Sequence, residues 1–256
     1  MKRRRWCSIS HFLLLGVLAS FALIAQLQSS CKTRGVQPAV ASPAAAQVST
    51  PTSPSLQLTT DAPPVEPGKF RQPDLVELVK LDPTIKLDIR YATANNFVGR
   101  PLYTEARAFL QKPATEALQR AHQKLRQQGY GLLIFDGYRP WAITKLFWDV
   151  TPPSLHNFVA DPRKGSKHNR GCAIDLSLFA LQTGQEVSMP GAYDEMTERS
   201  YPMYKGGTAE QRRTRDLLRA AMEAEGFAVN EYEWWHFDYK HWRQYPILNV
   251  SFAAIK

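Results

Sequence analysis

Cysteine is scarce in this chain, with three among 256 residues. Only Cys172 lies beyond the first 31 residues. The part of the chain after residue 31 therefore cannot form an internal disulfide, and it cannot build a cysteine-rich zinc site. Any metal bound there would need histidine and carboxylate ligands.

Long hydrophobic runs are also scarce, and the longest, residues 12–25, falls short of the roughly 20 residues that a spanning helix needs. Four basic residues at 2–5 precede this run and small residues follow it, which is typical of a secretory signal. We therefore expect residues 1–31 to direct export to the periplasm or cell envelope. An uncleaved N-terminal anchor is the alternative.

Small residues followed by Cys31 resemble the cleavage box of bacterial lipoproteins, in which the cysteine becomes lipid-modified. Gln28 stands where that pattern usually has leucine. Cys31 is therefore a lipidation candidate, and a plain exported chain with an incidental cysteine is the alternative. Contact with a membrane is expected only through the signal or this lipid.

Strong charge of one sign is absent from the rest of the chain. Residues 2–5 supply four of the nine net positive charges, and the remaining excess of +5 is too mild for a nucleic-acid binder. Hydrophobic residues make up 44% and charged residues 21%, as in ordinary globular proteins. This composition excludes a fully disordered, collagen-like or multi-span membrane protein.

Residues 32–68 hold seven of the 18 prolines and show no hydrophobic periodicity. Such a segment cannot bury enough apolar surface to offset the entropy of ordering it. We expect an extended tether there. Residues 69–256 remain as a single folded domain, long enough for one core and one active site.

Helix and strand patterns mix in this domain without a regular β-α-β alternation, which favours an α+β fold. Pro113 and Gly129 bracket a helix at 113–128, and a Thr208–Gln211 capping box opens a helix to about residue 225. A second short helix is expected near Trp141. Apolar patterns predict strands at 85–91, 130–135, 172–179, 227–229 and 234–239.

Three short motifs carry groups suited to catalysis: Asp136-Gly137-Tyr138-Arg139-Pro140, residues 166–175, and Glu233-Trp234-Trp235-His236. Two histidines and one aspartate, His168, Asp175 and His236, match the three protein ligands of a catalytic zinc. Glu233 would be a second carboxylate, free to accept a proton from water. Arg139 could pair with a developing oxyanion or a substrate carboxylate.

Spacing alone does not bring these groups together. His168 and Asp175 are seven residues apart, and an odd separation puts side chains on opposite faces of a regular strand. Convergence needs a loop at His168, which Gly171 would allow, and a bend near Glu233. Otherwise each histidine is a hydrogen-bonded structural residue, and the tryptophans before His236 belong to the core.

Together the motifs resemble those of the D-alanyl-D-alanine dipeptidases, within the zinc D,D-peptidases that share a His-x6-Asp … Glu-x-x-His arrangement. The resemblance spans most of residues 85–245 and adds Tyr91-Ala92-Thr93, Asn96-Phe97, residues 129–133, Asp194 and residues 198–200. It implies a single compact α+β domain with a small, mostly antiparallel sheet and flanking helices. It also implies one Zn²⁺ on His168, Asp175 and His236, with Glu233 as acid/base and Arg139 as transition-state stabiliser.

The same resemblance places Tyr91, Ser166 and Asp194 in a substrate pocket. One departure is Cys172, where the family more often has serine or alanine, and we expect it to be a small buried residue. The expected export is a second departure, because relatives linked to antibiotic resistance are cytoplasmic. Export favours turnover of wall-derived dipeptide over a resistance role.

The implied activity is zinc-dependent hydrolysis of the D-alanyl-D-alanine dipeptide to two D-alanines. One alternative is a zinc D,D-carboxypeptidase that trims terminal D-alanine from peptidoglycan pentapeptides, which export would suit. Another is a non-catalytic, zinc-containing lipoprotein that binds wall peptides. That last alternative predicts loss of Glu233 or Arg139, and both are present.

Overall fold

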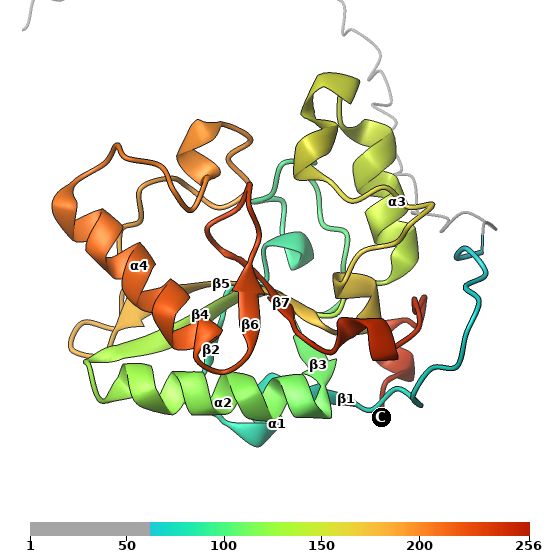
Figure 1. Cartoon of the computed structure of the whole chain (residues 1–256), viewed down its shortest axis with the longest axis horizontal. Helices are drawn as coiled ribbons and strands as arrows, with labels where there is room; N and C mark the ends of the chain where they lie inside the picture. The colour runs from blue at the N-terminus through green and yellow to red at the C-terminus, as the bar shows by residue number, and fades with distance from the viewer. Residues whose placement is uncertain (1–61) are drawn as a thin grey trace, which may run out of the picture. The chain divides into compact units, whose positions relative to one another are not determined.

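The computed structural model describes residues 62–256, drawn in colour in Figure 1. The expected export signal, Cys31 and most of the expected tether lie outside these residues. Over the described range, no helix combines the length and apolar character needed to cross a membrane.

A five-stranded sheet forms the centre of the fold. Its order is β2 (Lys86–Leu87), β4 (Tyr130–Asp136), β5 (Ala173–Ala180), β7 (His236–Tyr239) and β6 (Phe227–Val229). Only the β2–β4 pair is parallel, and the other pairs are antiparallel. A separate antiparallel pair joins β1 (Leu75–Glu77) and β3 (Phe109–Gln111). The mostly antiparallel sheet confirms the expected α+β class.

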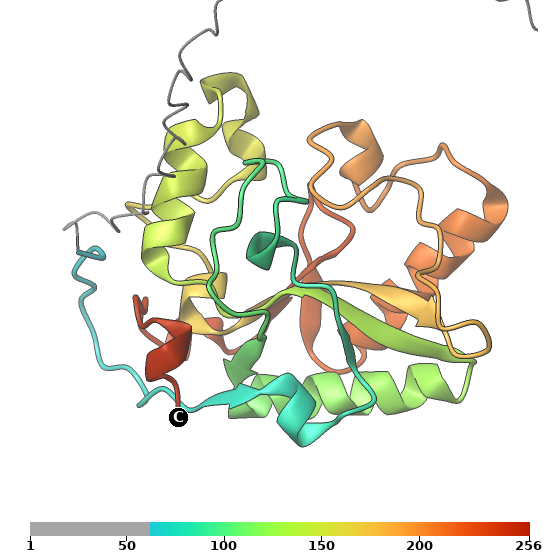
Figure 2. The same ribbon diagram turned by 180° about the vertical axis from the view of Figure 1, so that it is seen from behind.

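Helices lie on both sides of this sheet. The two long helices, α2 (Lys112–Arg126) and α4 (Ala209–Glu223), contact each other and pack on β4 and β6 respectively. Figures 1 and 2 show α2 below the sheet and α3 (Trp141–Val150) above it, among irregular segments. The short α1 (Leu78–Leu81) follows β1 directly.

The side chains of β5 alternate between the two faces of the sheet. Ile174, Leu176 and Leu178 are fully buried in the main core. Asp175 and Ser177 point to the opposite face because successive strand residues alternate. One strand therefore supplies both the core beneath the sheet and polar groups above it.

The two long helices begin and end as the sequence indicates. Pro113 lies in the first turn of α2, and Gly129 after it adopts a φ of 86°. The capping box of Thr208 and Gln211 is present at the start of α4, and Gly226 after that helix has a φ of 87°. Local chemistry thus determines both helix boundaries.

Two expected strands are shorter than the sequence pattern suggests. The strand expected at 85–91 is paired only over β2, and a 3₁₀ turn occupies Arg90–Ala92. Ile89, just before this turn, and Tyr91, within it, are both buried, so the apolar alternation here reflects burial and not a continuous strand. The last strand begins at His236, because the buried Trp234 and Trp235 belong to the preceding turn.

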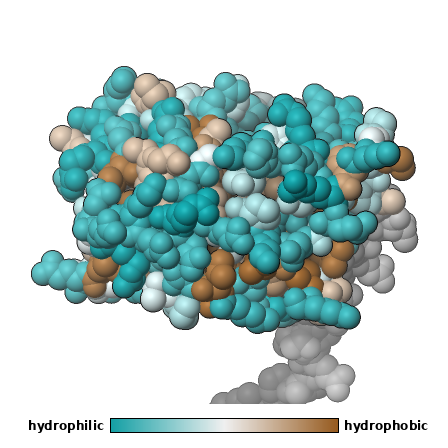
Figure 3. Space-filling model, turned by 60° about the horizontal axis from the view of Figure 1, so that its bottom comes forward, coloured by the Kyte–Doolittle hydropathy of each residue, from teal (hydrophilic) through white to brown (hydrophobic). Residues whose placement is uncertain are grey.

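The outer surface on the α2 side is mainly hydrophilic. Figure 3 views the molecule from below, and hydrophobic residues occur there in small separate groups. Exposed large hydrophobic residues of the described range are scattered along the chain: Val65, Leu81, Val150, Leu181, Met203 and Val250.

Leu176→Ala should destabilise the fold by about 2–5 kcal/mol, because it opens a cavity in the core beneath the sheet. Leu181 is 37% exposed, so Leu181→Ala should cost less than about 0.5 kcal/mol. Urea unfolding of both variants checks this expectation. Equal losses in the two variants would contradict the burial of Leu176 in the core beneath the sheet.

Candidate active site

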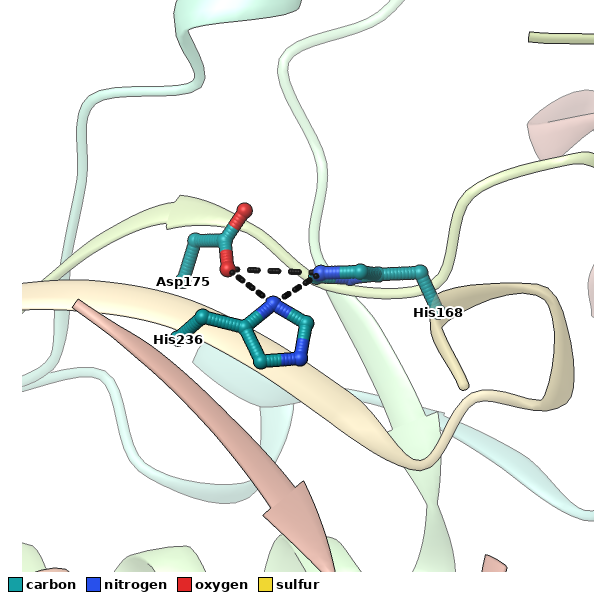
Figure 4. Close-up of side chains that lie close together, drawn as sticks. All are labelled: His168, Asp175 and His236. Atoms are coloured by element: carbon teal, nitrogen blue, oxygen red, sulfur yellow. Dashed lines mark hydrogen bonds and ion pairs between the residues drawn. The ribbon is translucent and has the colours of Figure 1, made fainter. Parts of the chain in front are cut away.

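Two histidines and one aspartate converge above the sheet. His168 lies in a 3₁₀ turn (His168–Arg170) before β5, Asp175 lies in β5, and His236 opens β7 opposite Asp175. His168 Nε2 is 3.1 Å from His236 Nδ1 and 3.3 Å from Asp175 Oδ1, and His236 Nδ1 is 3.0 Å from that oxygen. Figure 4 shows the three atoms facing one another.

Gly171 makes this convergence possible. It ends the 3₁₀ turn in the left-handed region with a φ of 63°. A Cβ at this position would also lie 2.4 Å from Leu75 Cδ2. The chain can therefore reverse direction before β5 and carry His168 over Asp175, despite their seven-residue separation.

The outward-facing atoms of both histidines are already engaged. His168 Nδ1 lies 2.7 Å from the carbonyl oxygen of Gly137, and His236 Nε2 lies 2.9 Å from Asp238 Oδ1. Both partners are acceptors, so these two nitrogens carry the ring protons. In the neutral rings, lone pairs of His168 Nε2 and His236 Nδ1 then face each other. Asp175 Oδ1 is buried and makes no hydrogen bond.

A divalent cation fits this set of acceptors. Bond lengths of about 2.0–2.2 Å to a tetrahedral Zn²⁺ place neighbouring ligand atoms roughly 3.4 Å apart, close to the distances here. Burial lowers the pKa of His236, but Asp238 and Asp175 outweigh it and raise that pKa to about 10. A proton on His236 therefore balances the cluster whenever no cation does, and a cation must displace it.

Glu233 stands beside this cluster in the turn before β7. Its Oε2 is 3.7 Å from His236 Nδ1, and its side chain is 16% exposed. Burial raises the pKa of Glu233 to about 7, against the pull of the His236 charge. A carboxyl group with such a pKa can accept and return a proton near neutral pH.

Arg139 lies on the other side, just after β4. Its Nε and Nη2 donate to Asp136 Oδ2 at 2.8 and 2.7 Å, and Nη2 is 3.5 Å from Asp175 Oδ2. The guanidinium carbon lies 5.2 Å from the ring centre of Tyr91 and 4.6 Å from that of Phe147. These contacts hold the cation of Arg139 beside the cluster.

Asp194 adds a further carboxylate to the wall of the site. The hydroxyl of Tyr91 donates to both carboxylate oxygens of Asp194, each at 3.1 Å. Burial, together with the charges of Asp175 and Glu233, raises the pKa of Asp194 well above its usual range. Asp194 has a φ of 58°, and among the described residues no other non-glycine has a positive φ. Such backbone strain is typical of functional sites.

All eight of the expected catalytic, metal and substrate residues line one cavity of about 250 Å³. They are Tyr91, Arg139, Ser166, His168, Asp175, Asp194, Glu233 and His236. Ser166 is buried there, and its Oγ accepts the backbone N–H of His168 at 3.2 Å. Phe97, Phe158 and Tyr232 add apolar surface to the wall.

Two supporting carboxylates were not expected from the sequence. Asp136 holds Arg139 and also accepts the hydroxyl proton of Tyr103 at 2.9 Å. Asp238 lies two residues after His236 on the same strand, and Lys167 Nζ is 3.0 Å from its other oxygen. The two-residue spacing, which puts both side chains on one face of a strand, was a signal that could have identified Asp238.

Cys172 is fully buried, as the sequence suggested. Burial raises the pKa of its thiol to about 12, so it is unreactive at neutral pH. His122 is a structural histidine, since its Nδ1 accepts the N–H of Leu132 at 3.2 Å.

Comparison with known proteins identifies relatives over most of the described range. The family profile described as D-ala-D-ala dipeptidase matches residues 71–251. The D-alanyl-D-alanine dipeptidase of Escherichia coli K12 is 35% identical over 181 residues, 71% of this chain and 92% of that protein. The protein of the same name from Enterococcus faecalis is 36% identical over 191 residues, covering 66% and 93%.

Among solved structures, the LD-carboxypeptidase LdcB aligns over 68% of this chain and 72% of its own. The identity is 21% and the TM-score is 0.40, which is a weak likeness.

Replacing one cluster histidine should abolish tight cation binding. His236→Gln removes a nitrogen from the three acceptors, and we expect Zn²⁺ affinity to fall by about a hundredfold or more. His156→Gln is the matched control, because His156 stacks on Trp148 outside the cavity. Calorimetric titration of the metal-free full chain measures both. Unchanged stoichiometry and affinity in His236→Gln would contradict the assigned cation site.

Proposed function

This chain belongs to the D-ala-D-ala dipeptidase family of peptidases, and from that premise we propose that it hydrolyses D-alanyl-D-alanine to two D-alanines. The observation that carries the proposal is the shared cavity. A cluster suited to a divalent cation, a carboxylate with a raised pKa and a buried arginine all face the same enclosed space. Metal-assisted peptide hydrolysis uses this combination of groups.

The cation in this proposal is one Zn²⁺ per chain, held by His168, Asp175 and His236. When bound, such an ion lowers the pKa of water towards about 7 and polarises a carbonyl oxygen. Asp238 and the carbonyl of Gly137 keep the two imidazoles in the tautomers that such binding requires.

Glu233 is the proposed acid/base. Its carboxylate accepts the proton of the water that attacks the peptide carbonyl carbon. The carbon–nitrogen bond then breaks, and Glu233 returns the proton to the amine of the departing D-alanine. The raised pKa of Glu233 supports both halves of this transfer.

Arg139 is the proposed partner of the oxygen that becomes negative during the attack. Asp136 and the flanking rings of Tyr91 and Phe147 fix its guanidinium before substrate arrives, so little reorganisation is needed in the transition state. Asp136 is bound by Nε and Nη2 of Arg139, so Nη1 is not bound to Asp136.

Tyr91, Asp194 and Ser166 are the proposed substrate groups. The carboxylate of Asp194 accepts hydrogen bonds from the hydroxyl of Tyr91, and the ammonium group of a free dipeptide would give it a positively charged partner. A dipeptide has such an amine next to the scissile bond, whereas a wall pentapeptide has an amide there. This difference favours the dipeptidase over the D,D-carboxypeptidase.

The N-terminal region sets the proposed location. Residues 1–31 act as an export signal, with Cys31 as a lipidation candidate, and residues 32–68 act mainly as a tether for the catalytic domain. The proposed role is therefore turnover of wall-derived dipeptide in the periplasm or cell envelope.

Release of D-alanine by the zinc-loaded full chain tests the substrate directly. We expect release from D-alanyl-D-alanine and at least about a hundredfold less from a wall pentapeptide. Preference for the pentapeptide would establish the carboxypeptidase instead. Release from neither would favour the non-catalytic binding protein.

Glu233→Ala and Arg139→Ala should each lower kcat for the dipeptide by at least about a hundredfold, because loss of one transition-state partner typically costs about 3–4 kcal/mol. Both variants should keep the circular dichroism spectrum of the parent chain. Matched controls are Glu198→Gln and Arg213→Ala, which change exposed residues outside the cavity. Near-normal turnover in either cavity variant would remove that residue from the mechanism.

A further inference from the structure

Glu66 connects the segment before the catalytic domain to the turn that carries His168. Its carboxylate accepts two hydrogen bonds from Arg170, from Nη1 at 3.2 Å and from Nη2, and one from the backbone N–H of Ile247 at 2.9 Å. Glu66 and Arg170 are 104 residues apart in the chain. The carboxylate therefore ties together three segments that are distant in sequence.

Arg170 is an integral part of the metal-cluster turn. It ends the 3₁₀ turn that begins with His168, and it is only 5% exposed. Its Nη1 also donates to the carbonyl oxygen of Tyr245 at 2.6 Å, and its guanidinium lies 5.3 Å from the ring centre of Trp242. A guanidinium this deeply buried needs a carboxylate partner, and Glu66 supplies it.

The rest of the turn is attached to the same junction. The carbonyl oxygen of Asn169 accepts the N–H of Leu248 at 2.9 Å, and the carbonyl oxygen of Arg170 accepts Gln111 Nε2 at 2.8 Å. Gln111 Oε1 in turn accepts the N–H of Asp74 at 2.8 Å. Contacts from both ends of the domain thus fix the backbone on which His168 sits.

We propose that Glu66 is a positioning residue for the metal cluster, acting through Arg170 on His168. His168 Nε2 lies within about 3.3 Å of its two partners, so a small displacement of the turn would change both distances and move His168 out of place as a ligand. Glu66 precedes residue 71, where the match to the family profile begins. The proposal rests on the cation site of the proposed function.

Glu66→Gln in the full chain is the test. This change removes the negative charge, nearly preserves the shape, and leaves Arg170 without its carboxylate. We expect Zn²⁺ affinity, measured with a competing chelator, to fall by about tenfold. The KM for D-alanyl-D-alanine should stay unchanged, and kcat should recover at saturating Zn²⁺. Glu66→Asp keeps the charge and should lie between the parent chain and Glu66→Gln.

The matched control is Glu210→Gln, which breaks a comparable glutamate–arginine pair with Arg213 on the exposed side of α4. Its Zn²⁺ affinity should equal that of the parent chain. A lower melting temperature of metal-free Glu66→Gln with unchanged Zn²⁺ affinity would overturn the proposal, because Glu66 would then stabilise the fold without positioning the metal cluster. Intact Zn²⁺ binding without dipeptide hydrolysis in the parent chain would instead contradict the proposed function alone.

Discussion

The close approach of three lone-pair-bearing atoms, each able to donate an electron pair to a cation, is the constraint on which the site depends. His168 Nε2, His236 Nδ1 and Asp175 Oδ1 lie 3.0–3.3 Å apart, and all three residues are buried. Such atoms repel one another unless a positive charge lies among them. Hydrogen bonds behind both rings prevent them from turning away, so the fold maintains an arrangement that only a proton or a cation can balance.

The sheet stabilises that arrangement because the strands that carry the cluster residues also contribute to the hydrophobic core. Ile174, Leu176 and Leu178 of β5 and Phe237 of β7 lie in the core, whereas Asp175 and His236 on the same two strands line the cavity. The close packing of the core below the sheet therefore restricts the movement of the cluster side chains above it. Charge is balanced in the same local manner, since Asp136 holds Arg139, and Lys167 pairs with the carboxylate behind His236.

The sequence predicts best where local chemistry decides the structure. Pro113 and the Thr208 capping box identify their helices, and the His-x6-Asp and Glu-x-x-His motifs identify residues that share the cavity. The sequence pattern does not reveal the turn at 90–92, because buried residues before and within a turn can alternate like those of a strand. The pairing of Glu66 with Arg170 could not be predicted, since contact between such distant residues leaves no periodic pattern.

The identity of the atoms around the bound ion tests the account most directly. X-ray absorption at the zinc edge of the loaded full chain should reveal two imidazole nitrogens and carboxylate or water oxygens at about 2.0–2.2 Å. No sulfur should appear at about 2.3 Å, because Cys172 is buried with its thiol protonated. A spectrum with a sulfur ligand, or with oxygen ligands alone, would contradict the central claim that His168, Asp175 and His236 form the catalytic metal site.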